Sequence, residues 1–181
     1  MARARLANGV LGAIPAERRQ ELVDGGGIPP LYVLWHMTRH QDVAVNAVLR
    51  GRDELVHRWC DRIGVSSDLW RGLAEGADLD LVEVLDPEAV GGYALEVLDS
   101  AIEWVETDPD GTLRLDRLDE VPAAADALAA LGTPAEDFGW LYGMWDGKPR
   151  QWFLSWEGHA HVVTHTGELV SLRNRMGLSP F

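Results

Sequence analysis

The stretch from Gln151 to Met176 constrains the fold most, because its apolar residues recur at the spacing of one buried helical face. Steps of three or four separate the members of this face, which are Leu154, Gly158, His161, His165, Leu169, Leu172 and Met176. Such a period is typical of an amphipathic helix. Buried imidazoles are costly unless their nitrogens have partners. The pattern therefore predicts a core helix in which His161 and His165 share a partner, and a metal ion is the simplest one.

Length, charge and cysteine content limit the classes of protein that fit. A chain of 181 residues is most simply one domain, covering 1–181, that buries about two thirds of its unfolded surface. A net charge of -13 argues against nucleic-acid binding, and no run approaches the roughly 20 apolar residues of a membrane span. The start has no signal-peptide pattern, and Cys60 is the single cysteine. We expect a cytoplasmic protein that binds a small molecule. The size of the chain is also compatible with a homodimer formed through helix faces.

Helical patterns cover most of the first 108 residues. Helices are predicted over 3–13, from Pro15 to Val23, over 31–49, over 53–63, and from Pro87 to about Asp108. The segment 31–49 is apolar on most sides, which is typical of a central helix. The last of these segments has the clearest start, because Asp86 is a good N-cap and proline fits the first turn.

No single period continues between Gly111 and Arg150. A short extended segment is predicted over 112–116, a short helix over 123–131, and an aromatic, glycine-containing connection follows. The fold prediction is therefore all-α, a bundle of three or four long helices with a long irregular connection before the last helix.

Two pairs of histidines have the spacing that places both side chains on one helix face. They are His161 with His165 and His36 with His40, and each pair lies in an apolar helix. We interpret His40, which is followed by Gln41 and Asp42, as a neighbour of the site and not a ligand. His57 and His159 are predicted to be non-ligands, since one lies in an arginine-rich segment and the other points across the helix from His161.

Two motifs make the chain resemble a known family. Trp35-His36 in a central helix and the late His161-x-x-x-His165-x-Gly-Glu-Leu-x-x-Leu-Arg resemble the DinB-like superfamily, as do the Asp86-Pro87 helix start and Trp104. This superfamily includes mycothiol-dependent S-transferases and the N-terminal domains of maleylpyruvate isomerases. The similarity covers most of the chain but is poor in the first helix and over 106–150. It implies a DinB-like four-helix bundle.

The resemblance also implies a metal site. Its ligands would be His36 from the second helix and His161 and His165 from the fourth, with His40 as a neighbour. Glu168 stands where many relatives have glutamine, and is either an acceptor that supports a ligand or a helix-surface residue. Zinc or nickel is the usual ion in such bundles, and imidazoles also suit iron.

The implied function is a metal-dependent S-transferase or isomerase that uses a low-molecular-weight thiol such as mycothiol or bacillithiol. Three protein ligands leave a position open, as catalytic zinc sites do. The alternatives are a non-enzymatic metal-binding stress-response bundle and a vestigial, empty site. A zinc protease is excluded because no glutamate follows His161, and neither a Gly-x-Ser-x-Gly elbow nor a phosphate-binding loop is present. Cys60 with His57 as a nucleophile and base is disfavoured, since a single cysteine usually packs as a small apolar residue.

Eight tryptophans are unusually many for this length and could also wall a pocket. The candidates for the pocket wall are Trp35, Trp140, Tyr142 and Trp145. Trp152 and Trp156 are predicted to be core residues.

Overall fold

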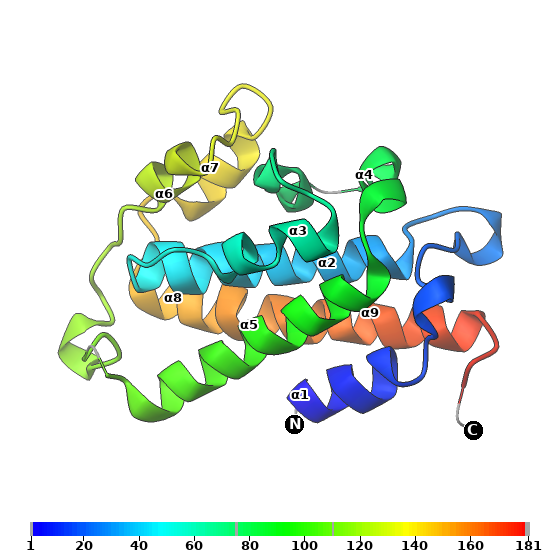
Figure 1. Ribbon diagram of the computed structural model, residues 1–181. Helices are drawn as coiled ribbons and strands as arrows, with labels where there is room; N and C mark the ends of the chain where they lie inside the picture. The colour runs from blue at the N-terminus through cyan, green and yellow to red at the C-terminus, as the bar shows by residue number, and fades with distance from the viewer. Residues whose placement is uncertain (1, 75, 110, 180–181) are drawn as a thin grey trace.

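The computed structural model describes residues 2–74, 76–109 and 111–179, and within these residues the regular structure is entirely helical (Figure 1). The predicted all-α class is therefore confirmed. The described residues form four long helical stretches. The first is α1 (Ala2–Leu6) with the π-helical turn η1 (Ala7–Leu11), and the second is α2 (Pro30–Asp42) with the π-helical turn η4 (Val43–Leu49). The third is α5 (Pro87–Thr107), and the fourth consists of α8 (Arg150–Ser155), the π-helical turn η8 (Trp156–Ala160) and α9 (His161–Arg175). Among the described helices, none combines the length and the apolar character needed to cross a membrane.

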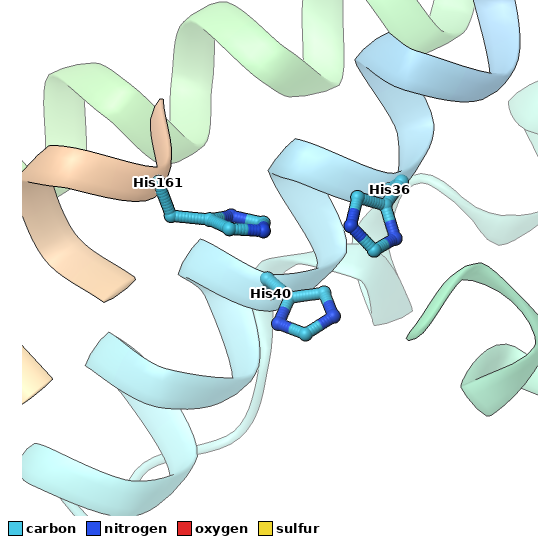
Figure 2. A group of neighbouring side chains, drawn as sticks. All are labelled: His36, His40 and His161. Carbon is cyan, nitrogen blue, oxygen red and sulfur yellow. The ribbon is translucent and has the colours of Figure 1, made fainter. Parts of the chain in front are cut away.

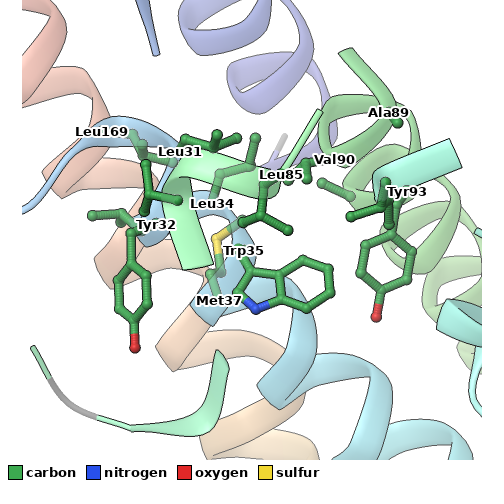
Figure 3. Packing of buried hydrophobic residues seen from close by; sticks show 14 of the residues in the cluster. Leu31, Tyr32, Leu34, Trp35, Met37, Leu85, Ala89, Val90, Tyr93 and Leu169 are labelled. Carbon is green, nitrogen blue, oxygen red and sulfur yellow. The ribbon is translucent and has the colours of Figure 1, made fainter. Parts of the chain in front are cut away.

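α2 lies at the centre of the molecule. It packs against α5 and α9, and α1 packs against the same two helices (Figure 1). Every residue of α2 from Pro30 to Asp42 is buried, which confirms the prediction of a central helix. Figure 3 shows Leu31, Leu34 and Trp35 of α2 packed with residues of α5 and with Leu169 of α9.

α5 begins where its capping signal predicts. The carboxylate of Asp86 accepts a hydrogen bond of 2.7 Å from the backbone N–H of Ala89, and Pro87 occupies the first turn. The spacing of apolar residues along α5 predicts a buried face of Val90, Tyr93, Ala94, Val97, Leu98, Ala101, Ile102 and Val105, and the first six of these are buried. Ile102 and Val105 are exceptions, because they lie on the solvent side of the helix and are exposed.

The helix predicted from Pro15 to Val23 is wrong. The chain forms only the 3₁₀ turns Ala16–Arg18 and Val23–Gly25 there. The Arg19 side chain turns inward, and its guanidinium donates hydrogen bonds to the carbonyls of Leu11, Ile14 and Pro87. A buried guanidinium needs such acceptors, and reaching them fixes the chain in a path that a continuous helix could not follow.

Two further segments differ from the predicted pattern. The helix predicted over 53–63 is divided into the 3₁₀ turn η5 (Leu55–Arg58) and α3 (Cys60–Ile63). The predicted extended segment over 112–116 is wrong, since a 3₁₀ turn begins there and spans Leu115–Arg117. The rest of the long connection is partly helical, with α6 (Ala124–Ala130), as predicted, and α7 (Gly139–Trp145).

Two short elements before α5 complete the fold. The 3₁₀ turn η6 (Leu69–Leu73) packs against α2. α4 (Leu79–Val84) was not predicted, although it has a good cap, since the Asp78 carboxylate accepts a hydrogen bond of 3.0 Å from the N–H of Leu81.

Five consecutive polar residues of α2, Thr38–Asp42, divide the apolar core and are called the polar belt below. One apolar cluster includes α2 up to Met37, and the second begins at Val43. All five belt residues are buried. Asp42 accepts hydrogen bonds from the N–H groups of Leu55 and Val56 and from the Tyr93 hydroxyl, at 3.0, 2.9 and 2.6 Å. Asp42 thus ties α2 to η5 and to α5.

Replacing Asp42 by alanine is expected to lower the free energy of unfolding by about 3–5 kcal/mol, because it leaves the buried N–H groups of Leu55 and Val56 and the Tyr93 hydroxyl without their acceptor and removes one of the carboxylates beside Arg39. Urea denaturation measures this change. Asp146→Ala, which removes an exposed carboxylate at the end of α7, serves as the control and should change stability by less than about 0.5 kcal/mol. Equal stability of the two variants would contradict the role of the belt.

Candidate metal centre

Four histidine rings meet between α2 and α9. His36 and His40 come from α2, one turn apart, and His161 and His165 come from the first turns of α9. The centroid of the His36 ring lies 5.2 Å from the centroid of the His161 ring and 5.0 Å from that of the His165 ring. In Figure 2 the His161 ring points from α9 toward the α2 face that carries His36 and His40. The i, i+4 spacing places each pair on one helix face, and the packing of α2 against α9 brings the two pairs together.

One triad of the cluster has its nitrogens close enough together to hold a single ion. His36, His40 and His161 each offer a nitrogen, and these atoms lie within 4.8 Å of one another. The sequence instead predicted His36, His161 and His165, with His40 beside them. His36 and His161 belong to both triads, so the hydrogen bonds of His40 and His165 bear on the third ligand.

His36 and His165 each hold one nitrogen against a protein acceptor. Nδ1 of His36 lies 2.9 Å from the carbonyl oxygen of Gly72, and Nδ1 of His165 lies 2.8 Å from a carboxylate oxygen of Glu168. A carbonyl and a carboxylate only accept, so Nδ1 carries the proton and Nε2 keeps its lone pair. Metal-binding histidines are commonly oriented in this way.

Nε2 of His165 faces its neighbour on the helix at hydrogen-bond distance. The Nε2 atoms of His161 and His165 are 3.1 Å apart. Two nitrogens bound to one ion at 2.0–2.1 Å in tetrahedral geometry would be separated by about 3.3 Å. The observed separation therefore fits two ligands of one ion.

His40 is held differently. Its Nδ1 lies 3.3 Å from a Glu157 carboxylate oxygen, and its Nε2 lies 3.1 Å from the carbonyl oxygen of Leu73. Both nitrogens face acceptors, and a neutral imidazole carries a single N–H, so only one of these two contacts can be a hydrogen bond.

Glu157 is a site residue that the sequence analysis did not identify. Its side chain is fully buried, accepts a hydrogen bond of 2.8 Å from the Trp145 indole and contacts His40. Nδ1 of His161 is buried without a hydrogen-bond partner, and the Glu157 carboxylate lies 4.0 Å from it. The position four residues before His161, on the same helix face, was the available signal.

Burial keeps two of the imidazoles neutral. Loss of solvation, together with the neighbouring His40 and His165, lowers the pKa of His36 to about 2. The same causes, burial first, lower the pKa of His161 to about 2. A neutral imidazole is the form that binds a metal ion.

A cavity of about 340 Å³ opens beside His36, His161 and His165. Its other lining residues in the described part of the chain are Ile28, Tyr32, Val33, Ala74, Gly76, Trp156, Thr164 and Glu168. Trp156, predicted to be a core residue, is instead 41% exposed and forms part of the wall.

The four predicted wall residues lie elsewhere. Trp35 is fully buried against Tyr93, and Trp145 is buried behind the cluster with its indole on Glu157. Trp140 is exposed on α7, and the Tyr142 hydroxyl donates to the carbonyl of Thr133. Their closeness to the histidines along the sequence suggested a pocket wall, but it could not show which face of each segment meets the cavity.

The remaining candidates do not join the cluster. His57 and His159 are exposed. Burial raises the pKa of the Cys60 thiol, whose sulfur contacts the carbonyl of Val56. A raised pKa disfavours the thiolate, so the nucleophile reading gains no support.

Comparisons of the chain with protein-family models, curated proteins and solved structures give no match.

Gly72 places its carbonyl on His36 because it has no side chain. A Cβ atom there would collide with the Trp35 indole and would lie 2.9 Å from Cγ of Arg39. Gly72→Ala should displace η6 and remove the acceptor of His36, so metal affinity should fall about tenfold. Competition with a chromogenic chelator measures it. Gly143→Ala is the control, since a Cβ at that exposed helical position meets nothing within 4 Å; equal affinities for the two variants would contradict this role.

The metal-free protein should lose stability as the pH falls from 7.5 to 5. Because the pKa of His36 and His161 is lowered in the folded state to about 2, only the unfolded chain takes up protons near its ordinary pKa of about 6.5. The expected loss is on the order of 2 kcal/mol for each of the two histidines at pH 5.

Urea denaturation of chelator-treated protein across this pH range measures the loss. His36→Asn should flatten the dependence, whereas His57→Asn, at an exposed position, should leave it unchanged. A stability that does not vary from pH 7.5 to 5 would show that the imidazoles remain solvated.

Proposed function

We propose that this protein binds one divalent metal ion through His36, His161 and His165. The observation that carries the proposal is the 3.1 Å separation of the two Nε2 atoms on α9, close to that expected for two ligands of one ion. The Gly72 carbonyl and the Glu168 carboxylate hold the Nδ1 atoms of His36 and His165, which leaves their Nε2 atoms to bind the ion. His40 and Glu157 would then hold the surroundings of His161 in place.

We further propose that the fold is a DinB-like four-helix bundle. The contacts support it, since α2 and α1 each pack against both α5 and α9. The order of the ligands agrees with the family resemblance, in which one histidine comes from the second long helix and two come from the last.

Zinc or nickel is the ion we expect, and iron suits the same ligands. Neutral imidazoles bind all three, and three protein ligands leave room for a further one. The cavity reaches the site from one side, beside Tyr32 and Trp156.

The reaction we propose is the transfer of a low-molecular-weight thiol such as mycothiol to an electrophile, or an isomerisation that uses such a thiol. A divalent ion with an open position supplies the chemistry by lowering the pKa of a bound thiol and polarising a carbonyl. The chain's own residues would bind the two partners in the cavity, where Val33, Ile28 and Trp156 limit the access of water.

The second candidate is a non-enzymatic metal-binding bundle. It is favoured by the lack of an evident acid or base among the described cavity residues. Glu168 is engaged by His165, and burial raises the pKa of Tyr32 to about 12, so that its phenol is a poor proton donor at neutral pH. Turnover by the metal-loaded protein with a panel of thiols and electrophiles would decide for the enzyme.

Elemental analysis should find one divalent ion per chain. His161→Ala and His165→Asn should abolish stoichiometric binding, because each removes a ligand. His40→Asn should retain one ion and weaken its affinity about tenfold, because it removes only a supporting contact. His159→Asn is the exposed control.

Thermal unfolding with and without added zinc or nickel gives a second readout, since an ion that binds only the folded state raises the melting temperature. Loss of the ion in His40→Asn together with its retention in His165→Asn would replace the proposed triad by His36, His40 and His161. Absence of binding in the unaltered protein would refute the metal site.

A further inference from the structure

A second cavity, of about 600 Å³, lies on a different part of the bundle from the histidine cluster. It is formed by α5, by the stretch that contains η8 and α9, and by the connection after α5. Apolar side chains form most of its described lining, among them Leu98, Leu154 and Val162. Within the described part of the chain it shares no lining residue with the cavity beside the histidines, so it is a separate candidate site.

The apolar face of α5 continues past the helix that covers its first part. Arg3 at the start of α1 donates two hydrogen bonds to Asp99, at 2.5 and 3.0 Å, and Figure 1 shows α5 extending beyond this point. Ile102 and Val105 follow, and the spacing of α5 predicted both to be buried. They are instead 36% and 54% exposed and line the second cavity. Exposed apolar side chains gathered in a hollow are typical of a binding site.

Both ends of this cavity are closed. At one end stands Ala2 of α1. At the other end stand Leu113, whose N–H donates to the carboxylate of Asp108 just after α5, and Leu118, whose carbonyl accepts from the N–H of Gln151 in α8. These bonds, of 3.1 and 3.0 Å, hold the connection against the ends of the two helices.

The size of the cavity favours a small molecule as its occupant. The part of α5 that lines it runs from Leu98 to Glu106, a length of about 12 Å at 1.5 Å per residue. A helix or strand of a partner would continue beyond this length in at least one direction and would collide with one of the closed ends. Small-molecule sites have volumes of roughly 300–1,000 Å³, a range that includes this cavity.

Gln41 of the polar belt brings a polar group to the interior of this cavity. Its side chain is 3% exposed, and its amide nitrogen donates a hydrogen bond of 3.1 Å to the carbonyl of Gly158. A carbonyl only accepts, so this bond fixes which end of the amide is the oxygen. The Gln41 oxygen accepts no hydrogen bond from the described residues, yet solvent reaches it. Because Gln41 lines the cavity, this oxygen is available to a donor on a ligand.

We propose that this cavity binds a small, neutral, mainly apolar molecule that carries one hydrogen-bond donor, directed at the Gln41 oxygen. The body of the molecule would displace water from the apolar walls, which is favourable. A neutral ligand is preferred because Val45 and Leu98 form the buried part of the wall, where an ionised group would be costly. Glu106 and His159 are exposed at the rim. The site does not involve the proposed metal ion and goes beyond the proposed function.

The methyl groups of the isoleucines report binding at this cavity by NMR. The chain has four isoleucines, of which Ile102 lines this cavity, Ile28 lines the cavity beside the histidines, and Ile14 and Ile63 are fully buried. The probes are 1-naphthol and 1-methoxynaphthalene, which share an apolar body, while only the first has a donor. We expect both to shift the Ile102 signal saturably and to leave the Ile28 signal in place. No metal is added, so the result does not depend on the metal site.

Gln41→Met tests the hydrogen bond, because it removes the oxygen and keeps an unbranched side chain of similar length. The affinity for 1-naphthol relative to 1-methoxynaphthalene should fall by about fivefold in this variant, since one hydrogen bond is lost. The ratio between the two probes cancels any change in the apolar walls. The Ile63 signal shows whether the variant is folded.

Val105→Glu tests the location of the site without altering the polar belt. A charge on this part of the wall should weaken the binding of 1-naphthol by about tenfold. Val84→Glu on α4 is the matched control, because Val84 is also 54% exposed and is not a described lining residue of the cavity. It should bind both probes as the unaltered protein does.

Four outcomes would overturn the proposal. The first is an Ile102 signal that neither probe moves, and the second is movement of the Ile28 signal in its place. The third is broadening of the Ile102 signal with protein concentration in the absence of a probe, since a second copy of the chain would then occupy the cavity. The fourth is an unchanged ratio in a folded Gln41→Met variant, or unchanged binding by Val105→Glu.

Discussion

The hydrogen bonding of the polar belt is the constraint on which the rest of the structure depends. Five consecutive polar side chains in a central helix are tolerated only if each finds a partner. Arg39 donates to the carbonyl of Leu69, His40 lies against that of Leu73, and Gln41 donates to that of Gly158. These bonds hold η6 and η8 against α2. They also bring the Gly72 carbonyl to His36, so the bonds that stabilise the fold are those that build the site.

The parts of the fold that the sequence predicted are those governed by local rules. A continuous apolar period and a strong cap were enough to find α2, α5 and the last helix. The prediction of a helix after Pro15 is wrong because the Arg19 guanidinium donates a hydrogen bond to the carbonyl of Pro87, which is 68 positions away. Propensity and periodicity describe a segment and its immediate neighbours, and therefore cannot register a distant acceptor.

The candidate site was predictable to the same extent. The i, i+4 pairs and the family resemblance were sufficient to name the four histidines that the structure brings together. They gave no sign of the Gly72 and Leu73 carbonyls, since every residue has a carbonyl and the pattern of side chains does not reveal where it points. Glu157 was overlooked for a different reason: a glutamate next to a glycine resembles a solvent-exposed residue until the Trp145 indole is seen to cover it.

The π-helical turn η8 has a consequence for how relatives of this chain are recognised. A π-helical turn holds one more residue than the α-helical turn it replaces, and each residue added to an α-helix rotates what precedes it by about 100°. In an alignment with a relative whose last helix is regular, His161 and His165 would stay in register. A gap next to Gly158 would be needed to align Trp152 and the rest of α8. Gaps inside helices are ordinarily penalised, so a gap-free alignment of this helix would pair the wrong faces of its first half.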